Sequence, residues 1–160
     1  MNPELLNLFN KQINREFYTS YLYYAMSTYF DEIMMQGFSM YMKHNASKEL
    51  NLAQKMYDYL ILRDEKLSFL KIDELQSDWV DVSDIFANLL SNEQVIFDEV
   101  QKLYSIAKNY DDFGAMEFLN EIISEKTKSL SMARKMVFRI KNSKIIPFGI
   151  EFMDSYINSI

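Results

Sequence analysis

The chain has 160 residues and a mass of 19.1 kDa, a size typical of one domain with a substantial core. Hydrophobic residues make up 49% of it, the formal net charge is -6 and cysteine is absent, which argues against intrinsic disorder and excludes disulfides, thiolate metal sites and cysteine nucleophiles. The start of the chain lacks the apolar core of a signal peptide, and no apolar run is long enough for a membrane span. We therefore expect a single cytoplasmic domain over residues 1–160.

Two long helices are predicted in the first part of the chain. Glycine and proline occur only three times and twice, so their positions indicate where elements break. Asn2 and Pro3 form a helix start with proline at the first helical position, which predicts a helix over residues 3–31. Gly37 precedes a second stretch of helical periodicity, over residues 38–63.

The remaining elements follow a long interruption. Periodicity fades between residues 64 and 82, which predicts an extended connection rather than a tight turn. Ser83 can cap the helix that follows, Asp111 lies in a short turn after it, and Gly149 opens a short apolar and acidic segment. Helices are expected over residues 84–109, 113–141 and 149–158.

The connection lengths predict the topology. Short links make the first two long helices one antiparallel hairpin and the last two another. A helix of about 26 residues spans about 40 Å, so the long connection can cross the whole bundle and reset the chain direction. The expected fold is all-α: an up-down-down-up four-helix bundle with one long crossover and a short fifth helix at the C-terminus.

Each predicted long helix carries one charged residue inside its apolar stripe. These residues are Glu16, Glu49, Glu93 and Lys126. Buried carboxylates that lie close together need compensating positive charge. The pattern therefore predicts a metal held by the glutamates, the ammonium of Lys126 in an ion pair with Glu49 or Glu93, or competition for one space. The alternative is that the stripes are off by one position and all four charges are solvated.

Four segments resemble bacterial non-haem ferritins, and the similarity keeps the order and spacing of all five helices. The segments are NREFYTSYLYYAMS around Glu16, NASKELNLAQKMYDYL around Glu49, NEQVI around Glu93, and GIEFMDSYI near the C-terminus. The resemblance implies a ferritin fold, self-assembly into a closed homo-oligomeric shell of twenty-four subunits, and storage of iron as a ferric mineral. It also implies that ferrous iron is oxidised at a di-iron centre inside each bundle.

The resemblance assigns roles to individual residues. Glu16 and Glu93 match the two glutamates that each bind one iron, and Glu49 matches the glutamate that bridges the pair. Tyr23 matches the tyrosine beside the centre, and its catalytic role is left open. Glu125 is the remaining acidic residue of an accessory metal site.

Other positions depart from the family pattern. Leu52 stands where the family has a histidine ligand, while Lys126 and Ser129 stand where it has a glutamine and a glutamate. Lys48 and Lys128 occupy accessory positions that are acidic in the family. We therefore expect weakened or absent ferroxidase activity, because two irons need several carboxylates to offset their charge. The alternative is an active ferroxidase that uses Glu16, Glu49 and Glu93.

Haem and histidine ligation are not expected. The position that would supply a haem methionine in bacterioferritins is Leu50, so haem is excluded. Iron, as Fe2+ and Fe3+, is the ion that the resemblance implies. His44, the single histidine, falls off the core stripe and is predicted to be solvated. Trp79, alone in the crossover, is expected to anchor that segment to the bundle.

Acidic residues near the start of the fourth predicted helix are candidates for the lining of an iron channel. They are Asp111, Asp112 and Glu117. Basic residues near the end of the same helix are typical of a helix C-terminus in an acidic chain, so we expect neither a nucleic-acid nor a membrane partner. A purely structural shell, or a DNA-protecting relative with a smaller cage, is the remaining alternative.

Overall fold

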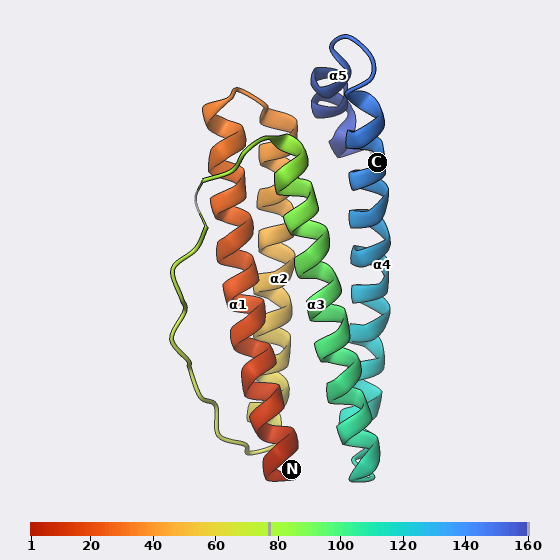
Figure 1. Ribbon diagram of the computed structural model, residues 1–160. Coiled ribbons are helices and arrows are strands. Elements are labelled where there is room, and N and C mark those ends of the chain that lie inside the picture. The colour runs from red at the N-terminus through yellow and green to blue at the C-terminus, as the bar shows by residue number, and fades with distance from the viewer. Residues whose placement is uncertain (77, 160) are drawn as a thin grey trace.

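The computed structural model describes residues 1–76 and 78–159, and within them every regular element is helical. The elements are α1 (Pro3–Glu32), α2 (Gln36–Leu62), α3 (Val82–Asn109), α4 (Phe113–Ser143), α5 (Gly149–Tyr156) and a 3-10 helix over Ile157–Ser159. Figure 1 shows α1 and α4 running in one direction and α2 and α3 in the other. The predicted topology, with its crossover and fifth helix, is confirmed.

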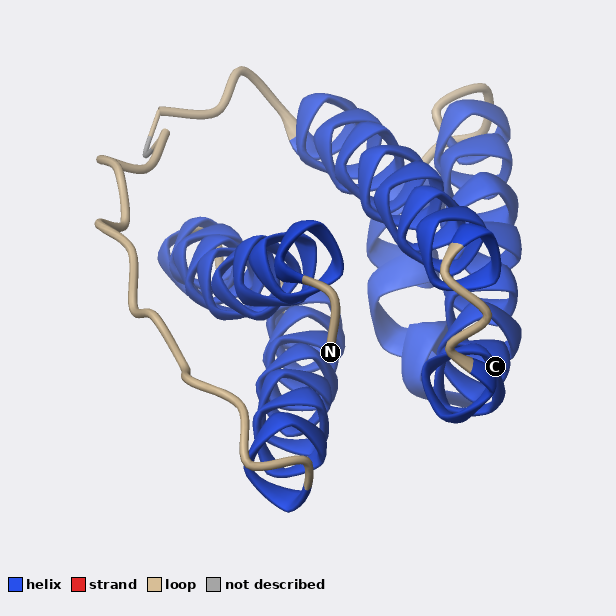
Figure 2. Cartoon of the chain, turned by 90° about the horizontal axis from the view of Figure 1, so that it is seen from below, coloured by secondary structure: helices blue, strands red, loops and turns tan. Residues whose placement is uncertain are grey.

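The crossover joins the far end of α2 to the opposite end of the bundle, where α3 begins. It runs beside α1 (Figure 1), and Figure 2 shows it outside the α1 and α2 pair. The side chains of Asn10 and Asn14 on α1 hold it by hydrogen bonds to the backbone of residues 66–70. Trp79 is only 9% exposed and packs into the core, so the expectation that it anchors this segment is confirmed.

Several helix boundaries differ from the prediction. α3 begins at Val82 because Asp81, not Ser83, is the N-cap: its carboxylate accepts a hydrogen bond of 2.9 Å from the Asp84 N–H. Aspartate and serine are both good caps, so the pattern alone could not choose between them. The predicted Ser83 cap is therefore wrong. α4 continues two residues beyond the predicted Lys141, to Ser143.

α5 completes the start of α2. Met35, the N-cap of α2, offers no capping side chain, and the Phe38 N–H instead donates to the Asp154 carboxylate of α5 at 2.7 Å. Asn158 donates to the Gly37 carbonyl at 3.0 Å. Gly37, predicted to precede α2, lies in its first turn, and a Cβ there would stand 1.7 Å from the Asp154 carbonyl oxygen. Only glycine permits this close approach.

The bundle interior consists of two apolar clusters with a polar layer between them. One cluster, toward the α5 end, is built around Phe30, Phe38 and Phe86. The other, toward the N-terminus, includes Phe9 and Leu119. In every long helix the charged stripe residue falls between the segments that supply the two clusters.

Large apolar side chains remain exposed around α5. This group, called the α5 patch below, consists of Ile145, Ile146, Phe148, Phe152 and Tyr156. Phe148 and Phe152 are 79% and 64% exposed, which is unusual for phenylalanine in an isolated domain. In the part of the chain that the structure describes, no helix has the length and hydropathy for crossing a membrane.

Candidate functional site

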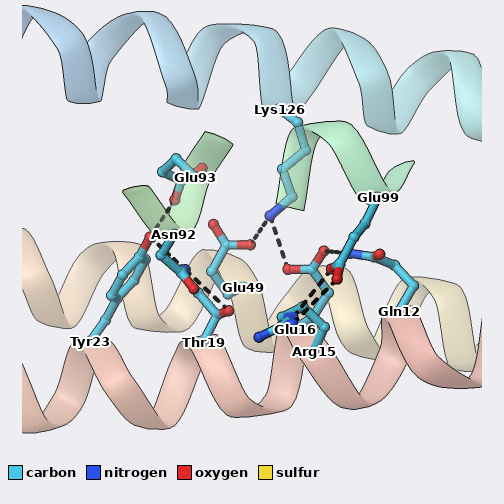
Figure 3. Close-up of polar contacts among 10 residues, drawn as sticks. All are labelled: Gln12, Arg15, Glu16, Thr19, Tyr23, Glu49, Asn92, Glu93, Glu99 and Lys126. Carbon is cyan, nitrogen blue, oxygen red and sulfur yellow. Dashed lines mark hydrogen bonds and ion pairs between the residues drawn. The ribbon is translucent and has the colours of Figure 1, made fainter. Parts of the chain in front are cut away.

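The polar layer contains the four charged residues that interrupt the apolar stripes. Glu16 is 0% exposed, Lys126 is 2% exposed, and Glu49 and Glu93 are each 3% exposed. The prediction that these charges lie in the core is confirmed, and the solvated alternative is wrong. Figure 3 shows the glutamates of α1, α2 and α3 around the lysine that reaches down from α4.

Lys126 joins two of the glutamates. Its Nζ donates to Glu16 Oε2 at 2.9 Å and also to Glu49 Oε2 (Figure 3). Gln12, one turn before Glu16, donates to the other oxygen of Glu16 at 2.7 Å. The predicted ion pair between Lys126 and Glu49 is therefore present, and its second partner is Glu16 rather than Glu93.

Glu93 belongs to a separate hydrogen-bonded group in the same layer. The Tyr23 hydroxyl donates to Glu93 Oε1 and accepts from Asn92 Nδ2 at 3.3 Å. Asn92 also donates to the Thr19 hydroxyl at 3.3 Å. Glu93 Oε2 is buried and has no hydrogen-bond partner among the described residues.

The electrostatics of the layer follow from burial opposed by charge pairing. Burial acts to lower the pKa of Lys126, but Glu16, Glu49 and Glu93 act in the opposite direction and raise it above its ordinary value, so the lysine stays charged. Burial raises the pKa of Glu16 to about 8, and Lys126 opposes that rise. Burial and the charge of Glu49 raise the pKa of Glu93. The layer thus contains three carboxyl groups and only one ammonium group.

The arrangement leaves no ready site for a metal ion within the residues described. No group of three potential ligand side chains there is arranged to hold one. The Lys126 ammonium lies between Glu16 and Glu49, so these carboxylates can share a cation only after the lysine moves. Leu52 is buried beside them and supplies no donor atom. Glu125 points outward, with its side chain 56% exposed and 3.6 Å from Lys55.

The predicted channel residues lie in the α3–α4 turn and in the first part of α4, toward the end of the bundle away from α5. Asp111 and Glu117 are exposed. Asp112 is already engaged: its carboxylate caps α4 through the Ala115 N–H at 3.0 Å and pairs with Arg63 at 2.8 Å. His44 is exposed, as predicted.

Three residues of the layer were not predicted from the sequence: Gln12, Thr19 and Asn92. Gln12 lies four residues before Glu16, and this helical spacing was a signal that could have identified it. Asn92 of α3 contacts Tyr23 of α1, and a contact between two helices cannot be predicted from the periodicity of either one. The nearby pair of Arg15 and Glu99, with contacts of 3.2 Å, likewise joins α1 to α3 (Figure 3).

Comparisons with known proteins give one consistent likeness. A family model described as a ferritin-like domain matches residues 6–143. The chain is 30% identical over 155 residues to a protein of Bacteroides fragilis (strain 638R) named bacterial non-heme ferritin, covering 97% of this chain and 96% of that protein. It is 26% identical over 160 residues to the bacterial non-heme ferritin of Campylobacter jejuni, covering 100% of this chain and 96% of the relative.

The fold shows the same likeness. The crystal structure of an open-pore ferritin from Archaeoglobus fulgidus superposes with a TM-score of 0.94 at 26% sequence identity. The superposition covers 97% of this chain and 96% of that one. The similarity therefore extends over nearly the full length in both sequence and fold.

Proposed function

Since the chain belongs to the ferritin-like domain family, we propose that it is a subunit of a closed shell that stores or buffers iron as a ferric mineral and has weakened or absent di-iron ferroxidase activity. Iron is the cargo in this proposal, and haem has no place in it. The expected particle contains twenty-four copies, as the resemblance to bacterial non-haem ferritins implies. A cytoplasmic location, with neither nucleic acid nor membrane as partner, is part of the same proposal.

The position of the Lys126 ammonium between Glu16 and Glu49 is the observation that supports weakened or absent ferroxidase activity. Oxidation at a di-iron centre needs two ferrous ions held close together by several carboxylates. The ammonium already neutralises part of the charge that would attract those ions, and it occupies space between the carboxylates. Leu52 offers no ligand atom to replace the lost coordination.

Iron loading at this centre would require a coupled rearrangement. The ammonium would have to leave two buried hydrogen-bonded partners, and a buried charge without a partner is strongly unfavourable. Storage itself does not need this step, since dioxygen can oxidise ferrous ions that have reached the inside of a shell, where the ferric product joins the mineral. Asp111 and Glu117 are the free candidates for a negatively charged channel, because Asp112 is held by Arg63.

One observation favours the alternative of an active ferroxidase built on Glu16, Glu49 and Glu93. The unpaired, buried Glu93 Oε2 is an acceptor that a single ferrous ion could satisfy. The two functions differ in the rate of ferrous oxidation, so the same experiment separates them.

The test compares initial rates of ferrous oxidation under air for the parent and a triple variant. Lys126→Gln, Leu52→His and Ser129→Glu together remove the competing charge and return a nitrogen ligand and a carboxylate. We expect slow oxidation by the parent and a rate at least about 10-fold higher in the assembled variant, a barrier change of about 1.4 kcal/mol. Lys135→Gln, an exposed site on α4, is the control and keeps the parental rate.

Rapid oxidation by the parent would support the active alternative. A correctly assembled triple variant that is no faster than the parent would refute the role given to Lys126. Storage is measured separately, as iron retained per shell after ferrous loading and removal of free iron on a sizing column. A shell that retains no iron would refute storage.

A further inference from the structure

A small cavity leads from the surface between α2 and α4 to the floor of the polar layer. Its volume is about 190 Å³. The residues that line it are Lys48, Glu49, Leu52, Glu125, Lys126, Lys128 and Ser129. Glu49, Leu52 and Lys126 are buried, whereas Lys48, Glu125 and Lys128 are exposed. The cavity therefore has a buried floor and a charged mouth.

The two carboxylates of the cavity already have positive partners. Glu49 is bound to Lys126. Glu125 lies 3.6 Å from Lys55, which also pairs with Glu121 at 2.9 Å. Lys48 and Lys128, at the mouth, are therefore the lysines of the cavity whose charges are not balanced by a paired carboxylate.

Lys48 and Lys128 make no hydrogen bond or ion pair with any residue that the structure describes. The positive charge of Lys48 is also felt inside the bundle: it lowers the pKa of buried Glu93 and so works against the rise that burial causes. Ser129 adds a hydroxyl donor to the same lining. Two lysines without a partner among the described residues and a serine thus line one concave space in a chain whose net charge is -6.

The volume suits a small ligand with some water. A water molecule takes up about 30 Å³ in the liquid, so 190 Å³ accommodates a compact ion and a few waters. Ammonium groups form short, charge-assisted hydrogen bonds to anionic oxygens, and each offers three donors. A divalent cation is disfavoured, because the nearest free charges are positive.

We propose that this cavity binds a small tetrahedral oxyanion, of which inorganic phosphate is the probe, between the ammonium groups of Lys48 and Lys128 with the Ser129 hydroxyl as a further donor. The oxyanion lies at the mouth and leaves the ion pairs of Lys126 intact. The site does not depend on whether the polar layer oxidises iron. Lys48 and Lys128 are positively charged, whereas the resemblance to ferritins implies acidic residues at these accessory positions.

The test is calorimetric titration of the full-length, assembled, iron-free protein with inorganic phosphate at low ionic strength. We expect saturable binding of one phosphate per chain. The double variant Lys48→Gln and Lys128→Gln should bind at least about 10-fold more weakly. Lys11→Gln with Lys135→Gln removes the same charge from exposed sites outside the cavity and should keep the parental affinity.

A second variant tests the cavity without removing a lysine. Ser129→Glu places a carboxylate in the lining and should also weaken phosphate binding at least about 10-fold, with the thermal unfolding curve showing that the bundle remains folded. Sulfate should displace phosphate, while chloride at the same ionic strength should leave most of it bound.

Three results would overturn the proposal. They are an absence of saturable binding to the parent, equal losses in the cavity variant and the equal-charge control, and displacement by chloride as complete as that by sulfate. None of them affects the measured rate of ferrous oxidation in phosphate-free buffer, so failure of this site and failure of the proposed function are distinguishable.

Discussion

At the scale of single residues, Lys126 determines whether the polar layer can be buried at all. It forms two hydrogen bonds to carboxylates that are almost fully removed from water. Three carboxylates so close together repel one another, and the raised pKa of Glu16 and of Glu93 reflects this surplus of acid groups in a desolvated place. The lysine thus does the charge-neutralising work that bound cations do in other proteins.

Removing the Lys126 charge should destabilise the iron-free protein. Lys126→Met keeps most of the side-chain volume but leaves Glu16 and Glu49 without their cation, so we expect a loss of about 3 to 5 kcal/mol in the free energy of unfolding. Urea unfolding at neutral pH measures it, and Lys135→Met, on the exposed side of α4, is the matched control. A loss below about 1 kcal/mol would show that the pair contributes little.

Tyr41 should make the stability depend on alkaline pH. Burial raises the pKa of Tyr41 to about 12, with the charge of Glu93 adding to the effect. Since the folded-state pKa lies above the unfolded value, this contribution is complete below about pH 10 and is lost as the pH rises toward 12.

The variant Tyr41→Phe should therefore lose stability less steeply between pH 10 and 12, by about 1.4 kcal/mol per pH unit. Denaturant unfolding at a series of pH values measures the difference in slope. The control replaces the exposed Tyr21 with phenylalanine. Parallel curves for the parent and Tyr41→Phe would contradict the prediction.

At the scale of the elements, the sequence predicted the helices well because each long helix carries an apolar stripe interrupted by few breaks. The stripe register was less accurate where two neighbouring residues are both apolar. Helical spacing from Met56 predicts Tyr59 as the next core residue of α2, but Leu60 is the fully buried one, while Tyr59 stacks on Phe118 with ring centroids 4.0 Å apart. Large aromatic rings can cover a core from its edge, and periodicity does not distinguish these two roles.

The candidate site was predictable in part for a similar reason. A charge inside an apolar stripe can be read from one helix, so Glu16 and Lys126 were identified correctly. The partner of a charge depends on how helices face one another, and that depends on packing throughout the bundle. For this reason the sequence left the partner of Lys126 open between Glu49 and Glu93, and did not predict its contact with Glu16.

The contact between α5 and α2 gives a prediction for an element. Asp154→Ala removes the acceptor for the Phe38 N–H, so we expect a loss of about 0.5 to 2 kcal/mol and faster hydrogen exchange in the first turn of α2. Glu151→Ala, an exposed acidic residue on the same helix, is the control. Unchanged exchange at Phe38 in Asp154→Ala would contradict the capping role.

At the scale of the whole molecule, the α5 patch is the surface that we expect to form contacts between chains. Large exposed apolar side chains gathered on one short segment typically mark a protein–protein contact. We expect light scattering to detect a large closed particle at neutral pH, and a monodisperse monomer or dimer would contradict assembly.

Truncation after Asn142 should leave a folded helical bundle, because α5 and its 3-10 extension contribute only Met153, Ile157 and the partly buried Ile150 to the two clusters. Assembly should weaken, since the truncation also removes the α5 patch. Circular dichroism and light scattering measure the two effects. An unchanged particle would show that the patch takes no part in assembly.

The docking of α5 also has a consequence for biosynthesis. α2 depends for its capping group on Asp154, a residue that the ribosome adds only after all four long helices have been made. A growing chain folds from its N-terminal end, so α2 forms at first with a frayed start. The α5 patch then takes its final place only when Asp154 reaches Phe38. If the α5 patch forms the contacts that we expect between chains, those contacts can be complete only after the last residues have been translated.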